Sequence, residues 1–182
     1  VDIINKKRLG LELSYSELDF FFNGYLKGKV KDYQMSSLLM AICINGMTDE
    51  EIFALTKIFI DSGDVLDFSE IPGIKVDKHS TGGVGDKTTL IIAPIVASLG
   101  IPVVKMSGRG LGYTGGTIDK LESIKGFNIA LSDNQVFNQV KKIGVVVTGQ
   151  TADLAPMDKA IYALRDVTGT VSSIPLIASS IM

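Results

Sequence analysis

The sequence predicts a two-part α/β protein, with an all-helical domain and the start of an α/β domain that has a mostly parallel sheet. Two observations lead to this prediction. The first 65 residues show only helical periodicity and helix-capping signals, whereas strand-like and helical segments alternate from residue 66 onward. From about residue 156 the pattern is helical again. We therefore expect residues 1–65 and 156–182 to form the helical domain, and residues 66–155 to form the partial α/β domain.

Helix signals divide the first 65 residues into four helices. Ser14 with Glu17, and Thr48 with Glu51, have the spacing of capping boxes, in which each side chain hydrogen-bonds to the backbone of the other residue. Apolar residues follow both boxes at helical spacing, and glycine ends the predicted segments. The expected helices are 2–9, 14–27, 34–44 and 48–62.

After a polar link, the chain alternates between strand and helix. The expected strands are 74–78, 103–106 and 145–148, and the helices between them are 86–99, 117–123 and 132–143. A strand, helix, strand, helix, strand order is typical of a parallel sheet. Two further helices, 156–165 and 171–182, are expected to return the chain to the helical domain.

A glycine-rich loop between the first strand and its helix predicts an anion site. Residues 77–90 contain three glycines within four positions and the only histidine, His79. Backbone N–H groups of such a loop can converge on a phosphate near a helix N-terminus. Lys78 adds a positive charge, while Ser80, Thr88 and Thr89 add hydroxyl groups.

A second glycine-rich stretch, 105–117, follows the next strand. Because neighbouring parallel strands end at the same sheet edge, Lys105, Ser107 and Thr117 are expected near the same anion. Farther along, the planar guanidinium of Arg165 suits a paired contact to a base or a carboxylate. A structural ion pair between Arg165 and either Asp166 or Asp158 is the alternative.

Composition excludes several classes of partner. A formal net charge of −2, from 18 basic and 20 acidic residues, provides no broad positive field for duplex nucleic acid. One cysteine and one histidine cannot form a Cys/His zinc site within the chain. Apolar runs are shorter than the roughly 18 residues of a membrane span. We expect a cytoplasmic protein that acts on small molecules, without nucleic acid, membrane or organic cofactor.

Four motifs, the second of which has two adjoining parts, occur in an order that resembles the bacterial pyrimidine-nucleoside and thymidine phosphorylases. They are Lys-His-Ser-Thr-Gly-Gly-Val-Gly-Asp at 78–86, Ser-Gly-Arg-Gly-Leu-Gly at 107–112, Thr-Gly-Gly-Thr-Ile-Asp-Lys-Leu-Glu-Ser at 114–123, Gly-Gln-Thr-Ala-Asp-Leu-Ala-Pro-Met-Asp-Lys at 149–159 and Ser-Ile-Pro-Leu-Ile-Ala-Ser-Ser-Ile-Met at 173–182. The resemblance covers essentially the whole chain. Members of the family are longer, so the chain resembles their N-terminal portion.

The resemblance implies reversible phosphorolysis of a pyrimidine nucleoside by inorganic phosphate, which gives the free base and (deoxy)ribose 1-phosphate. It implies phosphate binding and base binding by two sets of residues, and a homodimer formed through the helical domain. A potassium ion bound by backbone carbonyls near Gly85 and Lys87 is also implied. The phosphate set is Lys78, Ser80, Thr89, Ser107 and Thr117, to which Lys105 is added from its place on the strand; the base set is His79, Arg165 and Ser180, with His79 and Arg165 catalytic.

Two departures from the family pattern limit this expectation. Tyr113 stands where the family usually has histidine, and the family's base-binding lysine would lie beyond Ser180, past the last residue of this sequence. We therefore expect little or no turnover from these 182 residues alone. The alternatives are a non-catalytic helical dimerisation module with a vestigial phosphate loop, and a phosphoribosyltransferase similar to anthranilate phosphoribosyltransferase.

Overall fold

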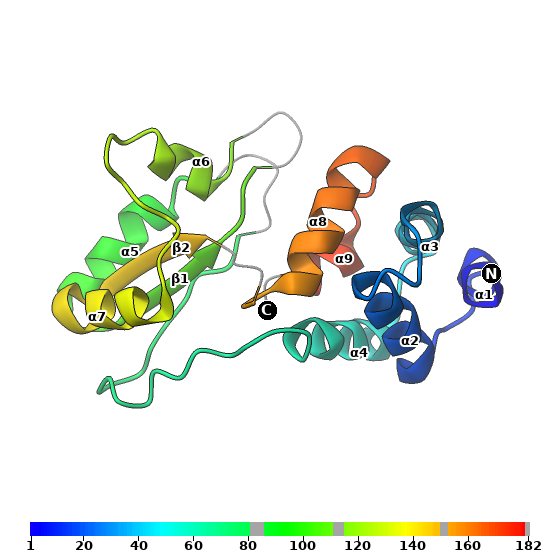
Figure 1. The fold of residues 1–182 in the computed structure, drawn as a ribbon, viewed down its shortest axis with the longest axis horizontal. Helices are drawn as coiled ribbons and strands as arrows, with labels where there is room; N and C mark the ends of the chain where they lie inside the picture. The colour runs from blue at the N-terminus through cyan, green and yellow to red at the C-terminus, as the bar shows by residue number, and fades with distance from the viewer. Residues whose placement is uncertain (81–85, 111–114, 150–152, 181–182) are drawn as a thin grey trace. The chain divides into compact units, whose positions relative to one another are not determined.

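The computed structural model describes residues 1–80, 86–110, 115–149 and 153–180 and divides the chain into two compact units (Figure 1). The helical unit comprises Val1–Val65 and Ala152–Met182, and the α/β unit comprises Leu66–Thr151. None of the helices in the described ranges is long and apolar enough to cross a membrane.

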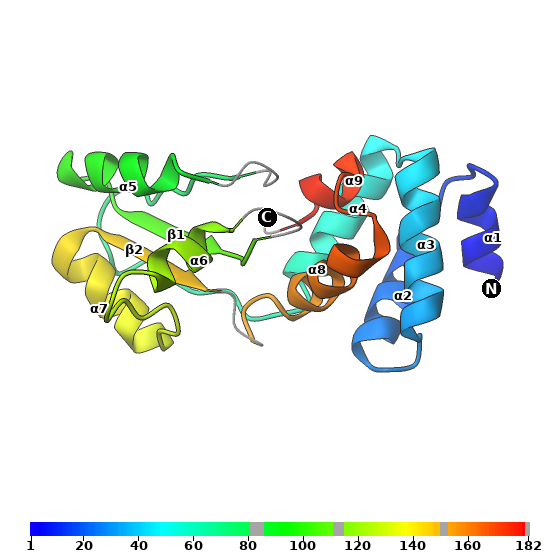
Figure 2. The same cartoon turned by 90° about the horizontal axis from the view of Figure 1, so that it is seen from above.

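The helical unit is built from the two ends of the chain. Its helices are α1 (Asp2–Arg8), α2 (Tyr15–Leu26), α3 (Asp32–Asn45), α4 (Asp49–Ile60), α8 (Pro156–Thr168) and α9 (Ile174–Ala178). Figure 2 shows α8 and α9, in orange and red, beside α3 and α4. The prediction of one helix over 171–182 is wrong at its start: α9 begins only at Ile174, because Pro175 lacks an N–H group and fits the first turn of a helix rather than its interior.

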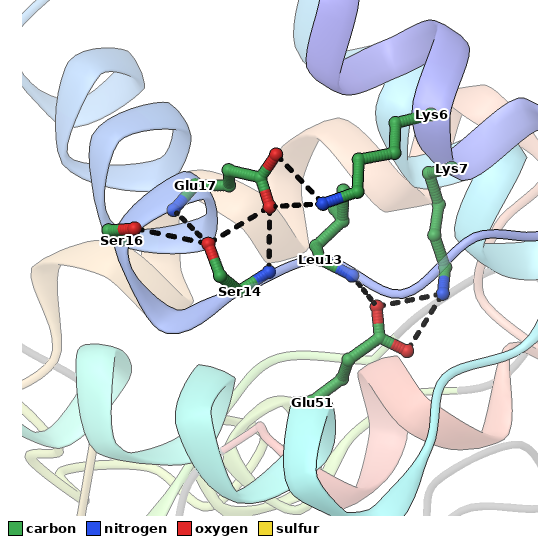
Figure 3. A network of polar contacts seen from close by, with 7 residues as sticks. All are labelled: Lys6, Lys7, Leu13, Ser14, Ser16, Glu17 and Glu51. Carbon is green, nitrogen blue, oxygen red and sulfur yellow. Dashed lines mark hydrogen bonds and ion pairs between the residues drawn. The ribbon is translucent and has the colours of Figure 1, made fainter.

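Polar contacts fix the starts of two helices in this unit, and Figure 3 shows those of Ser14 with Glu17 and of Glu51 with Lys7 and Leu13. Both predicted capping boxes are present, from Ser14 to Glu17 in α2 and from Thr48 to Glu51 in α4. Glu51 is buried, and both of its carboxylate oxygens lie 2.8 Å from Nζ of Lys7 in α1. The backbone N–H of Leu13 donates to the same carboxylate at 2.8 Å. The Glu51 side chain therefore joins α4, α1 and the segment before α2.

The core of the helical unit needs both ends of the chain. Residues from α2, α3 and α4 pack with residues from α8 and α9 in one apolar cluster. Fully or almost fully buried members include Leu18, Phe22, Met35, Leu38, Leu39, Ile42, Leu55, Ile58, Met157, Ile161 and Leu176. The return of the chain after residue 152 is therefore part of the packing of this unit.

The α/β unit contains a two-stranded parallel sheet among the residues described. Strands β1 (Val103–Ser107) and β2 (Val145–Gly149) pair from Val103 with Val145 to Ser107 with Gly149. Helices α5 (Thr89–Ser98), α6 (Thr117–Glu122) and α7 (Asp133–Ile143) gather around the strands in Figure 1. α5 packs on both strands and α7 packs on β2. The parallel alternation of strand and helix agrees with the predicted fold class.

The expected strand over 74–78 is wrong except at one residue. Val76 forms a single parallel bridge to Val103, with hydrogen bonds from Val76 N to Pro102 O and from Val104 N to Val76 O. Ile74 is 82% exposed, so the apolar alternation there has no layer to pack on. The predicted helix over 86–99 also begins later, at Thr89, because the Asp86 side chain accepts a hydrogen bond from the Thr89 N–H.

Candidate functional site

The Asp86 carboxylate is the centre of the predicted phosphate site. Its Oδ1 accepts hydrogen bonds from Lys78 Nζ at 2.8 Å, from Thr88 Oγ1 at 2.9 Å and from the Thr89 N–H at 3.1 Å. Its Oδ2 accepts from the Thr89 hydroxyl and from the Thr117 hydroxyl, the latter at 3.3 Å. Lys78, Thr89 and Thr117, which are separated in the sequence, therefore meet at one anionic group.

These hydrogen bonds decide the charge of Asp86. Burial alone would raise the pKa of its carboxyl, but the hydrogen bonds from Lys78 and Thr89 outweigh burial and hold the pKa well below its ordinary value. Asp86 is therefore an anion at neutral pH. The ammonium of Lys78 compensates this buried charge directly, and 32% of the Lys78 side chain remains exposed.

Two further predicted residues lie on β1. Lys105 is buried, and its Nζ lies 3.5 Å from Oδ1 of Asp77, the first residue of the glycine-rich loop 77–90. Ser107 is the last residue of β1 and is also buried. β1 therefore places the ammonium of Lys105 near the start of the first glycine-rich loop, and the hydroxyl of Ser107 within the second glycine-rich stretch.

Asp119 binds two glycines of the second glycine-rich stretch. Its Oδ2 accepts hydrogen bonds from the N–H groups of Gly110 and Gly116, each at 2.7 Å. A side chain at Gly116 would collide with the backbone of Arg109 and Gly110, so this close approach requires glycine. Gly116 directly precedes α6, and this contact therefore sets the position of Thr117.

Two predicted base-binding residues, Ser180 and Arg165, are buried in the helical unit, and Ser180 contacts a second buried carboxylate. Ser180 Oγ donates to Asp158 Oδ1 at 2.5 Å, and both residues are buried. Arg165 donates through Nε, Nη1 and Nη2 to the backbone oxygens of Thr170, Leu176 and Val171, at 3.4, 2.9 and 2.8 Å. Burial lowers the pKa of this guanidinium, while the charge of Asp158 opposes the shift.

Two consecutive regions of the sequence match the two parts of one protein family. Residues 1–63 match the model described as the helical bundle domain of a glycosyl transferase family, and residues 73–182 match its a/b domain. The chain belongs to this glycosyl transferase family.

Relatives within the glycosyl transferase family are similar over all 182 residues. Pyrimidine-nucleoside phosphorylases from Staphylococcus haemolyticus (strain JCSC1435), Geobacillus stearothermophilus and Staphylococcus aureus (strain N315) are 63%, 59% and 59% identical to the chain. All of this chain is covered, and it spans 42% of the length of each relative. These matches confirm the resemblance that the sequence motifs predicted.

A solved structure confirms the fold. Anthranilate phosphoribosyltransferase from Thermus thermophilus superposes with a TM-score of 0.72 over 99% of this chain and 56% of that chain. The sequence identity is 20%, so this likeness concerns the fold alone. Both chains share a helical part followed by the start of a parallel α/β domain.

The structure describes only some of the remaining predicted site residues. His79 is exposed, and Ser80 is half-buried. Lys87 is exposed and Gly85 lies outside the described residues, so the potassium site stays a prediction. Tyr113 also lies outside the described residues. No group of three or more acidic, histidine or cysteine side chains that could hold a metal occurs in the described parts of the chain.

Sequence reasoning missed two carboxylates, Asp86 and Asp119, that bind residues of the two glycine-rich loops. An anion site suggests basic and hydroxyl residues, and these two acidic residues were therefore left without a role, whereas Asp158 was considered only as an ion-pair partner of Arg165. Their positions carried a signal, because Asp86 closes the Gly-Val-Gly-Asp motif and Asp119 is the third residue of a helix that begins after Gly-Gly.

Proposed function

We propose that this chain is part of a pyrimidine-nucleoside phosphorylase, which reversibly converts a pyrimidine (deoxy)ribonucleoside and phosphate into the base and (deoxy)ribose 1-phosphate. The observation that carries the proposal is the convergence of Lys78, Thr89 and Thr117 on one buried centre, in a chain whose relatives of that name are 59–63% identical to it. A lysine and several hydroxyls at one point suit an oxyanion.

The proposed phosphate site serves to hold and aim the nucleophile. Lys78 supplies positive charge, and the hydroxyls of its neighbours fix the orientation of the anion, which lowers the entropic part of the barrier to attack on C1′. Lys105 contributes a second ammonium from β1, whose charge is partly balanced by Asp77. The full proposed set is Lys78, Ser80, Thr89, Lys105, Ser107 and Thr117.

The proposed base site stabilises the leaving group. Negative charge develops on the pyrimidine as the glycosidic bond breaks, and His79 is the proposed donor to the base, because imidazole is the side chain that most often serves as a general acid. Arg165 has five N–H groups, of which three donate to backbone carbonyls, so its remaining N–H groups are the ones proposed to bind the base. Ser180 is held by Asp158.

The test is phosphate-dependent release of uracil from uridine and of thymine from thymidine, using the longest natural chain that carries these residues. Lys78→Gln should lower turnover at least about a hundredfold, since it removes the charge that binds and aims phosphate. Lys75→Gln is the matched control, because Lys75 lies three residues earlier and its Nζ donates to the nearby Gly73 carbonyl. Equal activity of Lys78→Gln and wild type would contradict the proposal.

A parallel assay with phosphoribosyl pyrophosphate and magnesium addresses the phosphoribosyltransferase alternative. The likeness to anthranilate phosphoribosyltransferase extends to the fold, and we expect no transfer in this assay. Turnover with phosphoribosyl pyrophosphate but not with phosphate would replace the proposed reaction by that alternative.

We also propose that the protein forms a homodimer through the helical unit. Large apolar side chains on its surface support this: Tyr33 is 72% exposed, Phe20 70% and Phe53 74%. Analytical ultracentrifugation should give twice the chain mass, and Phe53→Glu should shift the protein toward the monomer. A wild-type protein that sediments as a monomer at all concentrations would contradict this.

A further inference from the structure

The Asp86 carboxylate accepts hydrogen bonds from the hydroxyls of two proposed phosphate ligands, Thr89 and Thr117. An ionised carboxylate can only accept hydrogen bonds, so the hydroxyls of Thr89 and Thr117 must be the donors in their contacts with Oδ2. Each hydroxyl has a single hydrogen. While these contacts persist, both oxygens can offer a bound anion only lone pairs.

Lys78 does not share this restriction. Its ammonium has three hydrogens, and one of them is directed at Asp86. Among the described residues the other two hydrogens have no acceptor and can serve a ligand, and the side chain is partly exposed. The cluster therefore combines a cationic donor with two hydroxyl acceptors, rather than three donors.

A ligand that fits this combination needs both acceptor oxygens and a hydrogen of its own. Hydrogen phosphate has both, because three oxygens can accept from Lys78 and the P–OH group can donate to a threonine oxygen. Sulfate has nearly the same size and, in mildly alkaline solution, the same charge, but it carries no hydrogen. The two threonine oxygens can only accept hydrogen bonds. Compared with hydrogen phosphate, sulfate would therefore form one hydrogen bond fewer and would place one of its oxygens in repulsive contact with a threonine oxygen.

We propose that Asp86 makes this site selective for an oxyanion that carries a hydrogen, such as hydrogen phosphate, over one that does not, such as sulfate. The inference rests on the proposed function, since it requires phosphate to contact Thr89 or Thr117. Asp86 acts as a positioning residue: it gathers Lys78 and the two threonines and turns their hydroxyl hydrogens away from the ligand.

The test compares the affinities of phosphate and sulfate by calorimetry in mildly alkaline buffer, with the longest natural chain and no nucleoside. Wild type should bind phosphate at least about tenfold more tightly than sulfate, as expected for one hydrogen bond involving a charged group. Asp86→Asn presents an amide that can itself donate to a threonine oxygen, which frees a hydroxyl hydrogen for the ligand. The phosphate-to-sulfate ratio should then fall toward one.

Asp67→Asn is the matched control, because it removes an exposed carboxylate that accepts hydrogen bonds from Ser69 in the same unit. It should keep the wild-type ratio. Thr89→Val and Thr117→Val provide a second measurement in case Asp86→Asn does not fold: at least one should weaken phosphate binding while sulfate binding changes little.

The possible outcomes separate the two proposals. An unchanged ratio in a folded Asp86→Asn protein, an unchanged ratio in both threonine variants, or equal wild-type affinities would overturn the role of Asp86. A wild-type protein that shows the predicted ratio but releases no base with phosphate would retain this role and contradict the phosphorylase proposal.

Discussion

Lys7 and Glu51 form a buried ion pair in which Nζ lies 2.8 Å from both carboxylate oxygens, with 3% and 2% of the two side chains exposed. The pair joins two helices through residues that are 44 positions apart along the chain. Charges taken out of water are tolerated only with such complete partners, because desolvation costs several kcal/mol for each ion.

Loss of one partner from this pair should destabilise the protein strongly. Lys7→Met leaves the buried Glu51 carboxylate without its cation and should lower the free energy of unfolding by about 3–5 kcal/mol, measured by urea denaturation. Asp61→Asn breaks an exposed pair with Lys57 in the same unit and should have little effect. Similar losses in the two variants would show that burial of the Lys7 pair is unimportant.

The pair between Lys6 and Glu17 should make stability depend on acidic pH. Hydrogen bonds from Lys6 and from the Ser14 N–H lower the pKa of Glu17 from 4.5 to about 2. Because the folded pKa lies below the unfolded one, the stabilisation is complete above 4.5 and is lost as the pH falls toward 2.

The unfolding midpoint of the wild-type protein should fall as the pH is lowered from 4.5 toward 2, and Glu17→Gln should make this fall smaller. Glu12→Gln, which removes an exposed carboxylate from the same unit, is the control for the change in net charge. The interpretation fails if both variants change this fall equally.

Gly115 and Gly116 should respond differently to alanine. At Gly116 the new methyl group collides with the backbone of Arg109 and Gly110, which displaces Thr117. At Gly115 it meets Asp119 Cβ and Oδ2, at the ordinary contact distances of 3.6 and 4.0 Å. Gly116→Ala should weaken phosphate binding about tenfold or more, an effect comparable to loss of one charge-assisted hydrogen bond. Calorimetry should find Gly115→Ala close to wild type.

Arg165 should be needed for stability as well as for the proposed base binding. Lysine cannot replace three guanidinium hydrogen bonds to carbonyls, so Arg165→Lys should cost about 1–3 kcal/mol in urea unfolding. The exposed Arg8→Lys serves as the control. A fully stable Arg165→Lys protein would show that these carbonyls find other partners.

Local signals in the sequence predicted most of the helices and the meeting of residues from the two glycine-rich loops. Capping residues at Ser14, Thr48 and Ser132 mark helix starts because their side chains satisfy backbone N–H groups within three residues. The convergence of Lys78 with Thr117 also followed from sequence, since loops after neighbouring parallel strands share one sheet edge.

What the sequence left open depends on contacts between distant residues. Alternation at Ile74 resembled a strand, but a strand needs a partner along its length, and only Val76 has one among the described residues. Arg165 allowed either an ion pair or a ligand contact, and its actual partners include carbonyls that α9 and the preceding turn provide. The Asp86 carboxylate was missed because its partners come from both loops.

The assembly of the helical unit from both ends of the chain has a consequence for biosynthesis. Met157, Ile161 and Leu176 complete the core that begins near Leu18, so a ribosome must release the whole of Leu66–Thr151 before this core can close. During that interval α2, α3 and α4 expose apolar surface, whereas residues 66–151 already carry the contacts of their own unit. We therefore expect the α/β unit to fold first and the first four helices to depend longest on chaperones.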